Sequence, residues 1–191
     1  MTHPFPPFTD IPPIDETIWA DGDLTVSDWE SQSGDQTNIF EYVNSNNDAT
    51  NVELRSAAII PDTVICGIDP DEVRILRFFV QNPSADPSPD QTVQVKCKCR
   101  YVDLFGATGE EASVAVKLRE GTTQIAVTSQ VTLDETLSDI TLTLSVAEIN
   151  SVGDWEDLNI EMRFEACSGD SIPNAGDLDL ECSQCRIIFS T

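Results

Sequence analysis

The middle of the chain, residues 112–166, contains four consecutive runs in which apolar and polar residues alternate with a period of two. Successive side chains of a β-strand point to opposite faces, so each run presents one face to a core and the other to water. The apolar members of the runs are Val114, Val116 and Leu118; Ile125, Val127, Val131 and Leu133; Ile140, Leu142, Leu144 and Val146; and Ile160, Met162, Phe164 and Ala166. Strands buried on one face are typical of antiparallel sheets, and the pattern predicts such a sheet.

The flanking parts of the chain predict further strands. Two or three short strands joined by long loops are expected over residues 17–56, and residues 52–60 alternate in the same way. Residues 73–80 are apolar at both parities, which indicates a strand that contains a bulge or is covered on both faces. Residues 92–101 alternate again, and residues 178–189 form the last expected strand.

Two local signals lie between these strands. Glu120-Gly121-Thr122 is typical of a hairpin turn, and residues 145–155 predict one short helical turn. The elements together amount to about eight or nine strands, spaced about 8 to 12 residues apart. The predicted fold class is therefore all-β, an antiparallel β-sandwich with a jelly-roll-like arrangement.

The first 16 residues differ from the rest because their dense prolines prevent a helix or a central strand. We expect residues 1–16 to form an extended N-terminal arm near the polyproline II conformation, attached to a single sandwich domain over residues 17–191. A disordered tail is the alternative. The apolar side chains of the arm recur every third residue, so they would line one side and could dock in a groove of a neighbouring subunit. They are Phe5, Phe8, Ile11 and Ile14.

Composition narrows the classes of partner. The 191 residues include 34 acidic and 10 basic side chains, which give a formal net charge of −24. This charge repels DNA, RNA and anionic lipid, so we expect neither nucleic acid nor a membrane as a partner. No apolar run approaches the roughly 20 residues that span a bilayer. The first residues, MTHPFPP, lack the basic and apolar regions of a secretion signal, and we expect synthesis in a cytoplasm.

Candidate catalytic chemistry is sparse. The single histidine, His3, lies in the arm, which argues against a histidine general base in a folded pocket. The sequence has no Gly-x-Ser-x-Gly elbow, phosphate-binding glycine loop or His-Glu-x-x-His motif. Paired carboxylates are the remaining option, but among 34 acids close pairs arise by chance. We expect neither enzymatic activity nor a cofactor.

Two kinds of residue could bind a metal ion. The acidic loops at residues 69–72 and 86–90 offer carboxylates to calcium, and their prolines equally fit ordinary turns. Of the six cysteines, Cys66 and Cys167 belong to no motif. The other four have the outline of a four-thiolate zinc site and are Cys97, Cys99, Cys182 and Cys185. We favour buried reduced thiols, with disulfides and zinc as the alternatives.

Three segments share a recognisable pattern, namely Val114–Ala126 (VAVKLREGTTQIA), Thr141–Glu148 (TLTLSVAE) and Val152–Ala166 (VGDWEDLNIEMRFEA). The pattern resembles a small β-sandwich domain that is common among the structural proteins of tailed bacteriophages. That family usually opens on a tryptophan, a short strand and an acidic loop, and Trp29 with residues 39–43 is similar to that opening. The likeness covers most of the chain after about Asp28, whereas the arm and the cysteines lie outside it.

The resemblance implies a non-enzymatic component of a tailed-phage virion and carries over no catalytic residue. The favoured role is a capsid decoration or cement protein, which would bind the outer head surface and stabilise it. The implied partners are the major capsid protein, other virion proteins and further copies of the chain. The alternatives are a tail, baseplate or head-fibre component, or a carbohydrate-binding host-attachment module. Such a module would use aromatics such as Trp19 or Trp155, although we expect Trp19 and Trp29 to anchor the core.

Overall fold

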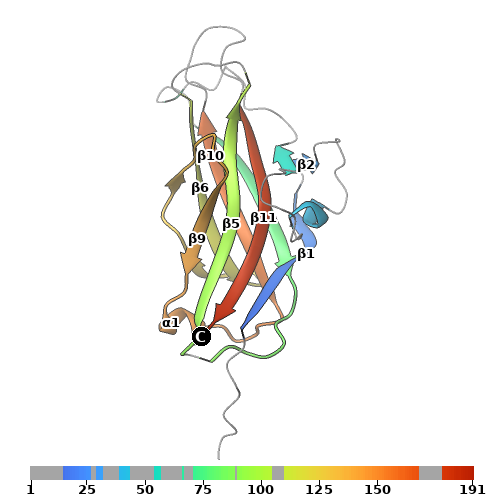
Figure 1. Ribbon diagram of the computed structural model, residues 1–191, viewed down its shortest axis with the longest axis vertical. Helices are drawn as coiled ribbons and strands as arrows, with labels where there is room; N and C mark the ends of the chain where they lie inside the picture. Colours follow the sequence, from blue (N-terminus) through green and yellow to red (C-terminus); the bar gives the residue numbers. More distant parts are fainter. Residues whose placement is uncertain are drawn as a thin grey trace, which may run out of the picture.

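The computed structural model describes residues 15–26, 29–31, 39–43, 54–56, 66, 71–88, 90–104, 110–167 and 178–191. Within these ranges the chain forms eleven strands, one 3-10 helix and one short α-helix. The strands pair antiparallel and pack in two layers (Figure 1), which confirms the predicted all-β, sandwich-like class. The apolar arm residues Phe5, Phe8, Ile11 and Ile14 lie outside the described residues.

The first layer is built around β11 (Leu178–Ser190), the longest strand. On one side β11 pairs with β5 (Thr92–Asp103), and β5 pairs in turn with β9 (Ser138–Thr143). On the other side it pairs with β3 (Leu54–Ser56), which pairs in turn with β2 (Trp29–Ser31). This layer lies in front in Figure 1.

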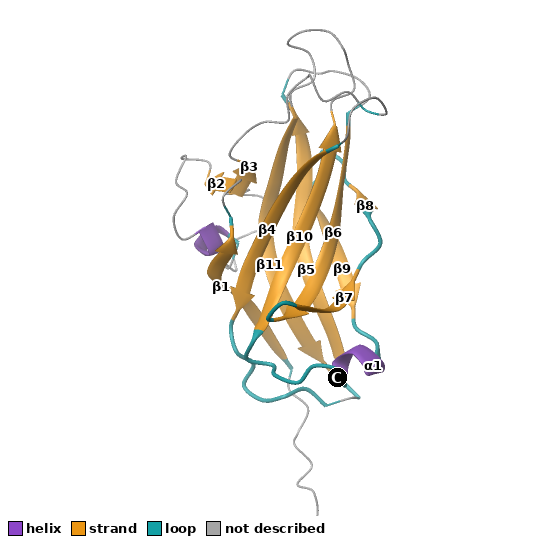
Figure 2. Cartoon of the chain, turned by 180° about the vertical axis from the view of Figure 1, so that it is seen from behind, coloured by secondary structure: helices purple, strands orange, loops and turns teal. Residues whose placement is uncertain are grey.

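The second layer is built around β10 (Leu158–Cys167) and lies in front in Figure 2. β10 pairs along its length with β4 (Glu72–Val80) and with β6 (Glu111–Glu120). The layer ends in β7 (Thr123–Val127) and β8 (Val131–Thr132), which both pair with β6. The strand count exceeds the predicted eight or nine because β2, β3 and β8 are only two or three residues long.

One strand joins the two layers. The first residues of β1 (Glu16–Thr25) pair with β11 of the first layer, and its remaining residues pair with β4 of the second. The β1–β4 register shifts twice, between Ala20 and Gly22 and between Asp23 and Thr25. Bulges bend a strand and raise its twist, which allows β1 to pass from one sheet to the other. The irregularity expected for residues 73–80 therefore falls in their partner strand.

The core lies between the two layers, where the alternating apolar positions of both sheets meet. Trp29 is completely buried, its Nε1–H donates to the carbonyl oxygen of Ile75 at 3.0 Å, and its ring centroid lies 4.9 Å from that of Phe164. Burial of each large apolar side chain contributes roughly 1.5–3 kcal/mol. Buried residues of the first layer include Val93, Val95, Cys97, Cys99, Ile140, Leu142, Cys182, Cys185, Ile187 and Phe189. Those of the second include Leu76, Phe78, Val114, Val116, Leu118, Ile160, Met162 and Phe164.

The strand β7 departs from the predicted parity. A register shift in the β6–β7 pairing places Ala126 opposite Leu118, so Ala126 is buried and Val127 is 42% exposed. The alternation of Ile125 and Val127 predicted that Val127 faces the core, and this prediction is wrong. The extra residue of a bulge reverses the facing of every side chain after it, and the sequence pattern does not reveal its position.

The predicted turn and helix both form. α1 (Val146–Ile149) begins with a capping box in which Ser145 and Glu148 satisfy each other's backbone N–H groups, and Ile149 is buried. The 3-10 helix η1 (Ile39–Tyr42) lies beside β1, and the N–H of Phe40 donates to Asp23 Oδ1 at 2.7 Å. Within the described ranges, no helix has the length and apolar character needed to cross a membrane.

A disulfide joins Cys66 to Cys167, two residues that are 101 positions apart in the sequence. Cys167 is the last residue of β10, and Cys66 precedes β4, the neighbour of β10 in the sheet. A cross-link over so long a loop removes conformational freedom from the unfolded chain, typically worth about 2–5 kcal/mol. The alternative of one or more disulfides is thus confirmed for this pair.

The hairpin turn between β6 and β7 contains a glycine in the left-handed region of backbone conformation. Gly121 has φ +53°, and a Cβ at this position would lie 2.8 Å from Asp157 Oδ2. We expect Gly121→Ala to lower the free energy of unfolding by about 1–2 kcal/mol, because an L side chain is strained in the left-handed region. Gly22→Ala is the matched control, since its Cβ would meet Phe79 only at ordinary contact distances of 3.6 and 3.8 Å. Equal loss in both variants, measured by urea unfolding, would contradict the explanation.

Candidate functional site

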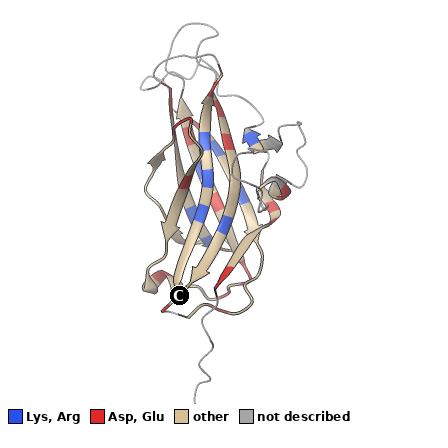
Figure 3. Ribbon diagram, in the orientation of Figure 1, with Lys and Arg blue, Asp and Glu red and all other residues tan. Residues whose placement is uncertain are grey.

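Positive charge is confined to the strands. All 10 lysine and arginine residues lie in β3, β4, β5, β6, β10 and β11, and none lies in a loop. Figure 3 shows them along the strands of both layers, whereas acidic residues are also found at the strand ends and in the connecting segments. The residues are Arg55, Arg74, Arg77, Lys96, Lys98, Arg100, Lys117, Arg119, Arg163 and Arg186. A chain with a net charge of −24 therefore carries two concentrations of positive charge, one on each sheet.

The outer surface of the first layer holds one of them, which we call the basic face and define as Lys96, Lys98, Arg100 and Arg186. Their neighbours in β5, such as Cys97 and Cys99, point into the core, so these side chains point outward. Lys96 lies opposite Arg186 in the register of β5 and β11. Like charges directly opposite each other are destabilising unless other groups compensate them.

The compensation on the basic face is incomplete. Arg100 Nε lies 2.6 Å from Glu181 Oε2, and the guanidinium of Arg186 lies 5.4 Å from the centre of the Trp19 ring. Arg186 also donates to the side-chain oxygen of Gln184. Lys96 and Lys98, by contrast, form no ion pair with any residue in the described ranges. Both lysines are half-buried, and Lys98 lies opposite Asp139 in the β5–β9 register without forming an ion pair with it.

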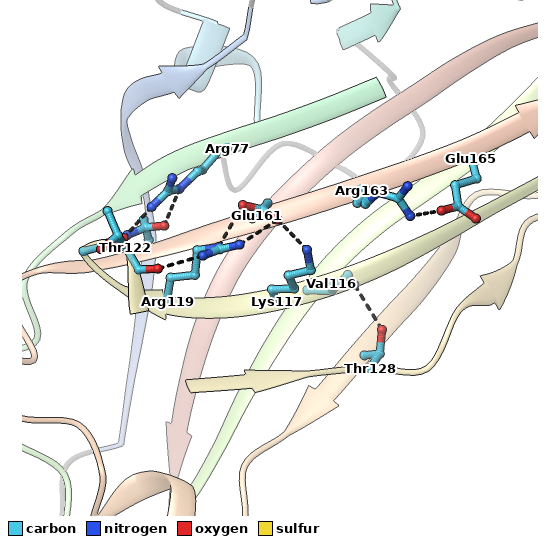
Figure 4. Close-up of polar contacts among 11 residues, drawn as sticks. Arg77, Val116, Lys117, Arg119, Thr122, Thr128, Glu161, Arg163 and Glu165 are labelled. Atoms are coloured by element: carbon cyan, nitrogen blue, oxygen red, sulfur yellow. Dashed lines mark hydrogen bonds and ion pairs between the residues drawn. The ribbon is translucent and has the colours of Figure 1, made fainter. Parts of the chain in front are cut away.

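The outer surface of the second layer is a closed ion-pair network around Glu161 (Figure 4). Lys117 Nζ donates to Glu161 Oε1 at 2.7 Å, Arg119 Nη2 donates to the same oxygen at 3.2 Å, and Arg119 Nε lies 2.8 Å from Oε2. Burial alone would raise the pKa of Glu161, but the hydrogen bonds and charges of Lys117 and Arg119 outweigh it. The pKa is therefore held below its ordinary value, and the carboxylate stays ionised.

A second set of contacts connects the network to the hairpin turn. Arg77 Nε donates to Asn159 Oδ1 at 2.6 Å, and both Arg77 and Asn159 donate to the carbonyl oxygen of Gly121, Asn159 at 3.0 Å. Burial, followed by the charge of Arg119, lowers the pKa of Arg77. Farther along β10, Arg163 pairs with Glu165. Arg74 pairs with Glu72, so every cation described on the second layer has a partner. These contacts indicate a structural role for this surface.

A polar recess of about 350 Å³ lies near the end of β10, lined by Asp71, Glu111, Ala112, Ser113, Gln130, Thr132 and Glu165. Asp71, from the acidic segment 69–72, is one of these lining residues. No group of three or more acidic, cysteine or histidine side chains within the described ranges is arranged to hold a metal ion. The recess can accept hydrogen bonds from a polar ligand, but it does not bring the carboxylates together as a cation site.

The four cysteines of the suggested zinc site come together in the core. Cys97 lies opposite Cys185, and Cys99 lies opposite Cys182, in the β5–β11 register. All four are completely buried free thiols, as the favoured interpretation predicted. Their sulfurs contact each other and Met162, with Cys99 Sγ and Cys182 Sγ each 3.9 Å from Met162 Sδ. Among the described residues, they are not arranged as a metal site. Sulfur contacts of this kind are ordinary core packing.

The tryptophans divide between core and surface. Trp29 anchors the core as predicted, and Trp155 is 6% exposed with its ring 5.9 Å from that of Phe189. Trp19 is half-buried beneath Arg186 and is the one tryptophan that reaches the surface. A carbohydrate-binding surface built on Trp155 would require this residue to leave the core. The carbohydrate-binding alternative stays a prediction, and of the two aromatics suggested for it only Trp19 reaches the surface.

The sequence contained part of this site. The alternation of Lys96, Lys98 and Arg100 with buried residues was visible in residues 92–101. Arg186 and Glu161 gave no local signal, because their neighbours become apparent only when β5, β11, β6 and β10 are paired.

Comparisons with known proteins assign no family. No family model matches the chain, and no curated protein sequence does. The solved CBM22-1 xylan-binding domain from Paenibacillus barcinonensis is similar over 94% of this chain and 97% of its own, with 12% identity and a TM-score of 0.35. A Stig cyclase from Fischerella sp. TAU is similar over 88% of this chain and 87% of its own, with 13% identity and a TM-score of 0.34. Likenesses this distant carry no argument about ligand or activity.

The Glu161 network yields a pH-dependent prediction. Glu161→Gln removes the counter-charge of Lys117 and Arg119, so we expect the free energy of unfolding at neutral pH to fall by about 2 kcal/mol. A carboxylate with a lowered pKa stabilises the fold fully above its unfolded value of roughly 4.3, and the contribution is lost as the pH falls through the folded value. The difference between wild type and variant should therefore shrink below about pH 4.

The control is Glu165→Gln, which breaks the more exposed pair with Arg163 and should cost less than about 1 kcal/mol. Chemical denaturation at a series of pH values measures both variants. A wild-type advantage over Glu161→Gln that stays constant from about pH 3 to pH 7 would contradict the assigned role.

Proposed function

We propose that this protein is a non-enzymatic structural component of a tailed-phage virion, and that it binds the outer surface of the head as a decoration or cement protein. The resemblance of residues 114–166 to phage sandwich domains supports the proposal. In the fold these residues build β6 to β10, including the central strand of the second layer. The segment of likeness thus supplies strands to both layers and contributes much of the core.

The observation that carries the proposal is the basic face. Lys96 and Lys98 lie on an open sheet surface of a strongly acidic protein and lack ion-pair partners within the described ranges. An outer sheet face with ammonium groups that form no ion pair suits contact with another protein surface better than capture of a small molecule, which usually requires a concave apolar pocket. The complementary surface on the head would be acidic.

The charge distribution also fits a selective contact. The rest of the chain carries most of its 34 acidic residues, so an acidic partner is repelled except where it meets the basic face. Complementary charge of this kind sets orientation and speeds association, and it weakens at high salt. The arm of residues 1–16 would add apolar contact to a neighbouring subunit, which an extended proline-rich segment can make at little entropic cost.

The test is binding of purified protein to phage heads that lack it. We expect the double variant Lys96→Gln and Lys98→Gln to bind roughly tenfold more weakly, because two interfacial charge contacts contribute about 1.4 kcal/mol together. We also expect its affinity to depend less on salt concentration than that of the wild type. Occupancy is measured by quantitative gel analysis of sedimented heads over a range of protein concentrations.

The matched control is the double variant Gln124→Glu and Ser129→Glu. It changes the net charge by the same amount, but the two exposed residues lie at the β7 edge of the second layer. If binding depends on the basic face, the control binds like the wild type. Unchanged occupancy of the lysine variant, or an equal loss in the control, would overturn the assignment of this face to the head surface.

A further inference from the structure

Four cysteines face the core from two adjacent strands. In the β5–β11 register Cys97 lies opposite Cys185, and Cys99 lies opposite Cys182, with a register shift between Cys182 and Gln184 that separates the two pairs. All four side chains are inaccessible to solvent. The two pairs differ in their surroundings: Cys97 Sγ lies 3.4 Å from Cys185 Sγ, whereas Cys99 and Cys182, which also interact with each other, each contact Met162 as well.

The backbone shows which kind of cross-strand pair Cys97 and Cys185 form. The N–H of Cys185 donates to the carbonyl oxygen of Val43 at 3.1 Å, so it points away from β5. Opposite residues of an antiparallel ladder either exchange both hydrogen bonds or exchange none. Cys97 and Cys185 are therefore a non-hydrogen-bonded pair, in which the Cα atoms lie about 4.5 Å apart. A disulfide requires a Cα separation of about 4.4–6.8 Å, and the usual spacing of a non-hydrogen-bonded pair falls within this range.

We propose that Cys97 and Cys185 form a cross-strand disulfide when the chain folds in the presence of a small-molecule disulfide oxidant. This bond would be a second covalent cross-link beside Cys66–Cys167, placed inside the core between the two longest strands of the first layer. It connects residues 88 positions apart in the sequence. Because the thiols touch in the folded protein, the native strand register accommodates the bond after a short approach of the two sulfurs.

The chemistry is two thiol–disulfide exchanges with glutathione disulfide as the oxidant. The Cys97 thiolate attacks one sulfur of the oxidant, which forms a mixed disulfide, breaks the oxidant's bond and releases one glutathione thiolate. The Cys185 thiolate then attacks the Cys97 sulfur and releases the second glutathione thiolate. The two protons lost by the protein thiols pass to the two released thiolates, and two electrons reduce the oxidant.

Burial determines when the exchange occurs. Burial, followed by the hydrogen bond with Cys97, raises the pKa of Cys185 well above its ordinary value. The thiolate is the attacking species, so exchange in the folded, reduced protein is slow. The bond therefore forms while β5 and β11 still admit solvent, during folding. A protein that has folded in reducing conditions keeps both thiols.

The test is oxidative refolding of the full chain from the denatured, reduced state in a glutathione redox buffer. The product is unfolded in iodoacetamide to block remaining thiols, digested without reduction and analysed by mass spectrometry. Trypsin cleaves after Lys98 and so separates Cys97 from Cys99, and a protease that cleaves after Glu181 separates Cys167 from Cys182 and Cys185. We expect Cys97 in a disulfide to the segment that contains Cys185, Cys66 linked to Cys167, and alkylated Cys99 and Cys182.

Two single variants identify the partner of Cys97. Cys185→Ser should leave Cys97 alkylated, while the matched variant Cys182→Ser should retain the Cys97 cross-link. Cys66–Cys167 reports in each sample that the chain has folded, and Cys97→Ala, with Cys185 then alkylated, replaces Cys185→Ser if that variant does not fold. Molecules that contain Cys66–Cys167 but have both Cys97 and Cys185 alkylated would overturn the proposal, as would a cross-link that survives Cys185→Ser.

A kinetic comparison tests the role of burial. Protein first folded in a reducing buffer and then moved to the same glutathione buffer should acquire the Cys97–Cys185 bond at least tenfold more slowly than the refolding chain. Equal rates from the folded and unfolded starting states would contradict the argument that the strands must open for the exchange.

Discussion

The structure depends on the burial of two apolar sheet faces against each other. β11 is central in the first layer and β10 in the second, and each pairs with a strand on both sides. Their inward side chains meet in one core, where Met162 of β10 contacts the sulfurs of Cys99 and Cys182 from the opposite sheet. β1 pairs first with β11 and then with β4, so the two sheets are also hydrogen-bonded to each other through one strand.

The surface chemistry follows from this burial. Because side chains alternate along a strand, placing Val95, Cys97 and Cys99 in the core forces the three cations of β5 to the outside. The same rule places Glu161 and Arg163 of β10 on the outer face of the other sheet. A register slip of one residue would expose the core and bury the charges, so the apolar pattern protects the position of the charged faces as well.

The two outer faces differ in their electrostatics. On the second layer, Lys117 and Arg119 are matched by Glu161, and the cost of placing these ions on a crowded sheet surface is offset within the molecule. On the first layer, Lys96 and Lys98 lack such partners within the described ranges. One face therefore stabilises the fold, and the other is where we propose a contact with another molecule.

The parts of the fold that depend on local pattern were predictable from the sequence. The alternation of residues 92–101, 114–118, 140–144 and 160–166 predicted β5, β6, β9 and β10, and Gly121 predicted the hairpin. Features that depend on pairing were not predictable. The bulge that turns Val127 outward, the crossing of β1 and the Glu161 network all require the register of two or three strands.

The disulfide shows the same limit, because Cys66 and Cys167 share no motif and meet only through the β4–β10 pairing. The arm residues lie outside the described residues, and both the arm and the proposed head-binding role concern contacts with other molecules. The basic face depends both on the local sequence pattern and on the pairing of β5 with β11. The alternation of its three β5 residues was visible in the sequence, and the fold showed that Lys96 and Lys98 form no ion pair with a described residue.

The most direct test of the account is quantitative mass spectrometry of purified phage particles separated into heads and tails. The account predicts that this protein copurifies with heads in a fixed ratio to the major capsid protein and is released by high salt. Its absence from both heads and tails, with the protein found only among unassembled soluble material, would contradict a structural role in the virion.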